Sequence, residues 1–66
     1  MFTEEQYDQM VDHETVRLMN LQVDKDEAMR IIKHYHTNGI TGLKDNVTID
    51  ACQRILKLYN TPVPAL

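Results

Sequence analysis

Three segments that can start an α-helix constrain this chain more than any other feature of its sequence. Thr3-Glu4-Glu5-Gln6 and Asp24-Lys25-Asp26-Glu27 both match the capping box, in which the first side chain accepts from the backbone of the fourth residue. Thr48 is a third candidate N-cap, while Gly39 and Pro62 are typical of the positions that follow a helix. These signals predict helices over about residues 4–21, 24–38 and 48–60.

Apolar residues follow each start signal at the three- and four-residue spacing of a helix face. They are Tyr7, Met10, Val11, Leu18 and Leu21, then Ala28, Ile31, Ile32 and Tyr35, then Ala51, Cys52, Ile55, Leu56, Leu58 and Tyr59. We expect Phe2 to pack against Tyr7 as a hydrophobic staple, and Ile40 to pack against Tyr35 in a Schellman motif. The pattern predicts one all-α domain over residues 1–66, a small three-helix bundle. A loop over residues 40–47 would join helices two and three, and the Pro-containing tail over 61–66 would be extended.

Length and cysteine content limit how such a bundle can be stabilised. The chain has 66 residues, and the core of so small a domain rarely contributes more than about 3–5 kcal/mol, so self-association is a plausible supplement. Cys52 is the single cysteine, which excludes an intramolecular disulfide and a cysteine-based zinc site. We see no signal peptide and no apolar run long enough to span a membrane, and therefore expect a cytoplasmic protein.

The residue types that catalysis needs are scarce. The sequence has no serine, and its two glycines cannot build a phosphate-binding loop. His34 and His36 are two positions apart, so a helix points them in opposite directions and they cannot chelate one ion. Cys52 lies on an apolar helix face, where it is expected to be a buried hydrophobic residue rather than a nucleophile. We therefore predict no enzymatic activity, no metal and no cofactor.

Charge is distributed unevenly along the chain. Residues 1–16 hold five acidic residues and no Lys or Arg, whereas the remainder holds seven basic and five acidic residues. Helix-dipole compensation explains acidic residues in the first turn but not Asp12 and Glu14. Met19 and other apolar residues fall beside the main helix faces, which favours an exposed patch. The predicted protein-binding residues are Glu4, Glu5, Asp8, Asp12, Glu14 and Met19.

The preferred functional prediction is a protein-binding module, acting as an inhibitor or adaptor. Its partner would be a protein with a basic surface, or a second copy that forms a dimer. A chain this short also resembles the small regulators that phages encode against host proteins. A self-associating structural subunit of a larger assembly is an alternative, and it predicts a melting temperature that depends on concentration.

A small DNA-binding regulator is the other alternative. The second and third predicted helices resemble a helix-turn-helix, with helix three as the reading helix. The connection predicted here has about nine residues, whereas that motif uses three or four, and the net charge of −3 does not favour phosphate binding. The candidate contacts are Arg30, Lys33, Lys44, Arg54 and Lys57.

Residues 16–58 also resemble a ubiquitin-associated three-helix module. The resemblance lies in Leu18-Met19-Asn20-Leu21, followed by the segments 24–32 and 51–56. Asn20 stands where that family has a glycine in its first loop, and the predicted second connection is longer. The resemblance implies a three-helix fold.

Overall fold

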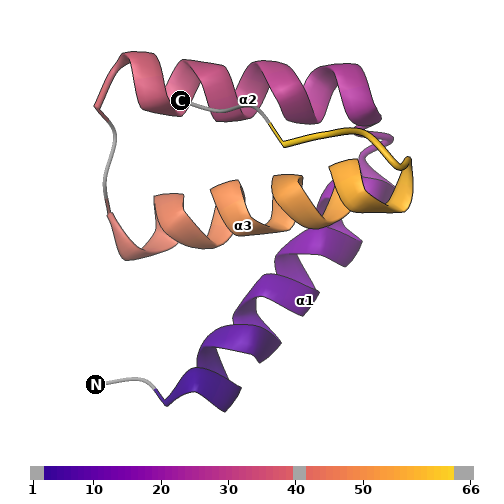
Figure 1. Ribbon diagram of the computed structural model, residues 1–66. Coiled ribbons are helices and arrows are strands. Elements are labelled where there is room, and N and C mark those ends of the chain that lie inside the picture. Colours follow the sequence, from indigo (N-terminus) through magenta and orange to yellow (C-terminus); the bar gives the residue numbers. More distant parts are fainter. Residues whose placement is uncertain (1–2, 40–41, 64–66) are drawn as a thin grey trace.

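The fold consists of three helices. A computed structural model describes residues 3–39 and 42–63. Helix α1 spans Glu4–Asn20, α2 spans Lys25–Thr37 and α3 spans Leu43–Leu58 (Figure 1). The predicted all-α three-helix architecture is therefore confirmed. Within the described part of the chain, no helix has the length and apolar character needed to cross a membrane.

Local capping sets the first two helix starts, as predicted. The Thr3 hydroxyl accepts from the Gln6 backbone N–H at 3.1 Å, and the Gln6 side chain accepts from the Thr3 N–H at 3.0 Å. Asp24 accepts from the Glu27 N–H at 2.9 Å, so it is the N-cap of α2. The reciprocal bond of the predicted capping box is not made in the described structure, where the Glu27 carboxylate pairs with Arg30 instead. The staple expected from Phe2 and the contact expected from Ile40 lie outside the described residues.

Helix α3 begins five residues before the predicted position. Gly42 is its N-cap, whereas Thr48 lies inside the helix, so the predicted loop over 40–47 is wrong from residue 43 onward. The reason is burial: Val47 lies one turn after Leu43, and helical geometry places Val47 in the core with an exposed fraction of only 6%. This tertiary contact outweighs the weak helix propensity of Asp45 and Asn46.

Each helix is followed by a residue in the left-handed backbone region. Gly39 has φ 63°, Gln22 has φ 62° and Asn60 has φ 53°. After α1, the backbone of Val23 donates to the Leu18 carbonyl at 3.0 Å, and Thr61 bonds to Leu56 in the same way after α3 at 2.9 Å. This is the Schellman pattern, which satisfies the last carbonyls of a helix. Helix three accordingly ends at Leu58, before the predicted residue 60.

Helix α3 is the centre of the molecule. Helices α1 and α2 each pack against it, and in the described residues they do not pack closely on each other. Figure 1 shows α2 antiparallel to α3, while α1 crosses α3 diagonally and its N-terminal half projects beyond it. The buried residues are Val11, Leu18, Ala28, Ile32, Val47, Ala51, Cys52, Ile55 and Leu56, together with Thr15. The diagonal crossing leaves one side of α1 uncovered.

Candidate interaction surface

Five exposed residues form a continuous line along α1. They follow one another at spacings of three or four, so a helix aligns them on one side: Glu5, Asp8, Asp12, Val16 and Met19. The first three are acidic and the last two are apolar. Val16 is 58% exposed and Met19 48% exposed. We call these five residues the acidic–apolar stripe.

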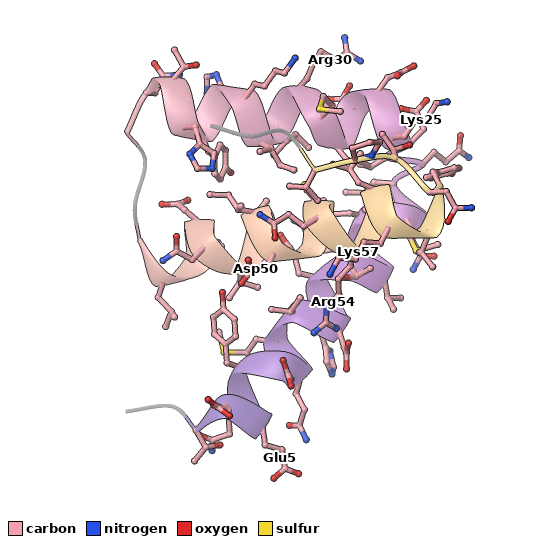
Figure 2. All side chains as sticks on the ribbon, in the orientation of Figure 1. Glu5, Lys25, Arg30, Asp50, Arg54 and Lys57 are labelled. Carbon is pink, nitrogen blue, oxygen red and sulfur yellow. The ribbon has the colours of Figure 1, made fainter. Side chains whose placement is uncertain are left out.

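Helix α3 flanks the stripe through Arg54. The Arg54 guanidinium contacts the carboxylate of Asp12 and lies 3.3 Å from that of Asp8. Figure 2 shows Arg54 at the crossing of the two helices, with Glu5 at the free end of α1. The Asp8 and Asp12 side chains remain 68% and 64% exposed, so Arg54 covers only part of each carboxylate.

Leu58 is an exposed apolar residue of α3 close in sequence to Arg54, which borders the stripe. It lies one helical turn after Arg54 on the same side of α3 and is 64% exposed. The C-terminal ends of α1 and α3 lie at the same end of the molecule (Figure 1). Leu21 and Tyr59, which directly follow these two helices, are 63% and 52% exposed. Most of the large exposed apolar side chains therefore gather at this end.

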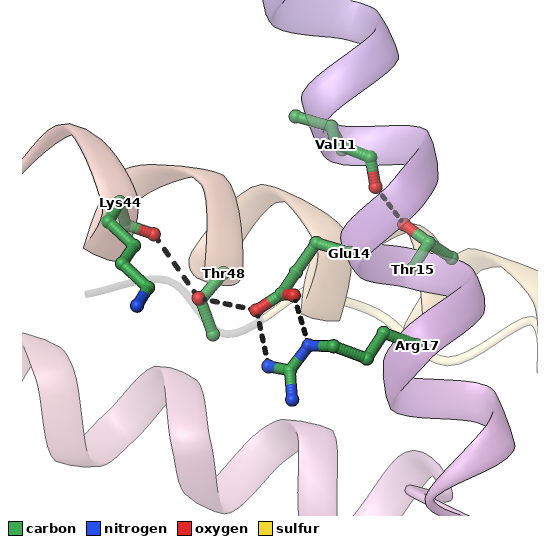
Figure 3. A network of polar contacts seen from close by, with 6 residues as sticks. All are labelled: Val11, Glu14, Thr15, Arg17, Lys44 and Thr48. Atoms are coloured by element: carbon green, nitrogen blue, oxygen red, sulfur yellow. Dashed lines mark hydrogen bonds and ion pairs between the residues drawn. The ribbon is translucent and has the colours of Figure 1, made fainter.

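Of the six residues predicted to bind protein, Glu14 does not belong to this surface. Its carboxylate accepts two bonds from Arg17, at 2.6 and 2.8 Å, and lies 2.9 Å from the Thr48 hydroxyl on α3 (Figure 3). The Thr48 hydroxyl is also 3.2 Å from the Lys44 carbonyl, so its single proton serves one acceptor at a time. Arg17 is the main cause of a lowered pKa for Glu14. Glu4 is exposed in the first turn, beside the stripe.

Two open grooves lie on the Glu14 side of α1. One, of about 710 Å³, lies between α1 and the start of α3, and Met10 and Val47 are its apolar lining. The other, of about 600 Å³, lies among all three helices, and Glu14 and Arg17 border both grooves. Sequence reasoning missed these grooves and the Thr48 contact, because both depend on the angle at which α1 crosses α3.

The basic residues proposed for DNA contact do not share one surface. Figure 2 shows Arg30 pointing away from α3, whereas Arg54 and Lys57 lie on the side of α3 nearer α1. Arg30 pairs with Glu27 at 2.6 Å on α2, which also carries the exposed Lys33. Lys44 and Lys57 lie in the first and last turns of α3, about 20 Å apart along its axis.

The predicted length of the connection between helices two and three is also wrong. Only residues 38–42 connect them, rather than about nine residues. This shortens the connection toward that of a helix-turn-helix. Helix α3, however, packs against α1 as well as α2, and its buried residues include Ala51 and Ile55.

Two further titratable groups, the buried Cys52 and the partly buried Tyr7, have raised pKa values. Burial of the Cys52 thiol raises its pKa to about 11, which keeps it neutral and unreactive. The Tyr7 hydroxyl donates to Asp50 on α3, and burial, followed by this bond, raises the pKa of Tyr7 to about 12. In residues 3–39 and 42–63, no three His, Cys, Asp or Glu side chains come together as a metal site.

No family model, curated protein or solved structure matches the chain.

Proposed function

We propose that this chain is a non-enzymatic protein-binding module that contacts its partner through the acidic–apolar stripe and Leu58. The observation that carries the proposal is the exposure of Val16, Met19 and Leu58 beside a line of carboxylates. Such a module would act by occupying or bridging another protein, as an inhibitor or an adaptor.

The apolar half has the properties of an interface centre. Exposed apolar side chains that gather in one place, with polar residues around them, are typical of protein-binding surfaces. Met19 adds an unbranched side chain that adapts to a partner. Burial of these side chains would supply affinity, because removing apolar area from water is favourable.

The acidic half supplies selectivity. Glu4, Glu5, Asp8 and Asp12 gather near the free half of α1, and Arg54 is the single cation paired with them in the described structure. An excess of carboxylates attracts basic proteins and repels acidic ones. The proposed acidic surface does not include Glu14, because its carboxylate is bonded to Arg17 and Thr48.

A comparison of three proteins tests the proposal: the wild type, the double variant Val16→Glu/Met19→Glu, and the control Leu43→Glu. Leu43 is also exposed, at 45%, but lies at the opposite end of α3. Each would be used for affinity capture from cells that express the protein, followed by mass spectrometry. Far-UV circular dichroism would show that all three fold.

The expected result is a protein retained by the wild type and by Leu43→Glu but lost with the double variant. An identical set of captured proteins for all three would overturn the proposal. Saturable binding in a low-salt gel shift, lost on Arg54→Glu, would favour the DNA-binding alternative. A melting temperature that rises with protein concentration would favour the structural-subunit alternative.

A further inference from the structure

The stripe is acidic in its N-terminal half and apolar in its C-terminal half, and this arrangement determines which partner can bind it. Carboxylates occupy positions 5, 8 and 12, whereas apolar side chains occupy positions 16 and 19 and, on α3, position 58. We infer that the partner segment is an amphipathic helix with basic residues in one half of its contact face and apolar residues in the other. This inference rests on the proposed function.

A helix fits this surface better than an extended segment. The stripe spans about 21 Å and repeats every three to four residues, which matches the ridges of another helix. Arg54 on α3 contacts Asp12, so α3 borders the acidic half of the stripe and leaves its outer side open to a partner. A peptide that binds by adding a strand would need the free edge of a β-sheet, and residues 3–39 and 42–63 contain no strand.

The contacts of Arg54 show how a basic side chain engages the acidic half. One guanidinium contacts Asp8 and Asp12 together, although the two carboxylates come from different turns. Both side chains remain more than half exposed, so oxygen atoms are available to a further cation. Arg54 also competes with that cation, because it neutralises part of the charge that would attract it.

A second copy of this chain is a poor occupant of the same stripe. Parallel pairing of two stripes would place carboxylates against carboxylates, which repel. Antiparallel pairing would place Asp8 and Glu5 against Val16 and Met19, which would remove carboxylates from water without a partner charge. The order of side chains therefore favours a different protein with complementary charge.

Two labelled peptides of equal composition, each of about 18 residues, test the inference by fluorescence anisotropy. Both are helical and carry Arg and Leu on one face. In the block peptide the Arg residues precede the Leu residues, and in the interleaved peptide they alternate. We expect the wild-type protein to bind the block peptide at least about tenfold more tightly, with affinity falling as salt screens the exposed charges.

Protein variants locate the binding. We expect Asp8→Asn/Asp12→Asn and Val16→Glu/Met19→Glu to weaken binding of the block peptide severalfold. Arg54→Ala should tighten it, because the intramolecular competitor is removed. Arg30→Ala is the matched control, because it removes the same charge from α2, away from the stripe. Its affinity for the block peptide should stay within about twofold of the wild-type affinity.

Equal affinity for the two peptides, or weaker binding by Arg54→Ala in a folded protein, would overturn the inference. Self-association that is lost in Val16→Glu/Met19→Glu, without peptide binding, would instead identify a second copy as the occupant. Failure of the inference is distinct from failure of the proposed function. A captured protein that depends on Val16 and Met19 would uphold the function even if neither peptide bound.

Discussion

At the scale of single residues, Gln22 adopts an unfavourable backbone conformation. It follows α1 with φ 62°, in the left-handed region that costs a residue with a side chain about 1–2 kcal/mol. The Schellman bonds of Gln22 and Val23 to α1 hold it there. The analogous positions after α2 and α3 have Gly39 and Asn60, which tolerate this conformation better.

We therefore expect Gln22→Gly to raise the free energy of unfolding by about 0.5–1 kcal/mol. The gain is smaller than the strain itself, because glycine also increases the entropy of the unfolded chain. Urea denaturation followed by circular dichroism measures the difference. Asn60→Gly is the matched control and should gain less; a destabilised Gln22→Gly would contradict the argument.

Cys52 and Tyr7 make stability sensitive to alkali. Their pKa values are raised from 9.0 to about 11 and from 10.0 to about 12, so the folded state favours their neutral forms. Above about pH 9 the unfolded chain loses protons that the folded chain keeps, so the free energy of unfolding falls as pH rises toward 11–12. Below that range the contribution is fully present.

Urea denaturation at a series of pH values from neutral to alkaline measures this dependence. Cys52→Ala and Tyr7→Phe should each make the alkaline loss of stability shallower, because each removes one titrating group. The double variant should show the shallowest dependence. An unchanged pH profile in the double variant would show that other groups cause the effect.

At the scale of helices, Glu14 links α1 to the first half of α3, as Tyr7 does through Asp50. Its side chain is only 14% exposed and contacts Arg17 in its own helix and Thr48 across the interface. A neutral hydrogen bond contributes about 1 kcal/mol to stability, whereas one to a charged group contributes about 1.5–3 kcal/mol. Glu14 thus has a structural role in joining the two helices, in addition to bordering both grooves.

We expect Glu14→Gln to lower the free energy of unfolding by about 1 kcal/mol at neutral pH. The folded-state pKa of Glu14 lies below 4.5, so its contribution is present above that pH and is lost as pH falls through the folded-state value. The wild type and variant should therefore converge in acid. Glu5→Gln, at an exposed position, is the control and should change the free energy of unfolding by only about 0.5 kcal/mol or less. If the free energies of wild type and Glu14→Gln differed by the same amount at every pH, the effect would not arise from the charge of Glu14.

At the scale of the whole molecule, stability depends on a single central helix. Leu56 and Ile55 are fully buried on α3, which holds both α1 and α2. Leu56→Ala should cost about 2–5 kcal/mol, which is comparable to the total stability expected of a domain this small. We expect this variant to be largely unfolded by circular dichroism at room temperature. Leu58→Ala removes the same atoms from an exposed site and should remain folded; a folded, cooperative Leu56→Ala would show that the core extends beyond these contacts.

The sequence by itself determined where the first two helices begin, and its apolar spacing indicated which side of each helix is buried. Thr3, Asp24 and Gly39 act on backbone groups only two to four residues away, so their effect is readable without a fold. The acidic half of the stripe and Met19 were predictable for the same reason, since helical spacing aligns them. Contacts between distant residues were not.

The tertiary structure alone decided the start of α3, the pairing of Glu14 with Thr48 and that of Arg54 with Asp12. The last two pairs are separated by 34 and 42 positions in the sequence. Leu58 is likewise exposed, although it belongs to the apolar pattern of its helix. The physical reason is that hydrogen bonds within a helix are local, whereas the angle at which two helices pack depends on how all of their buried side chains fit together.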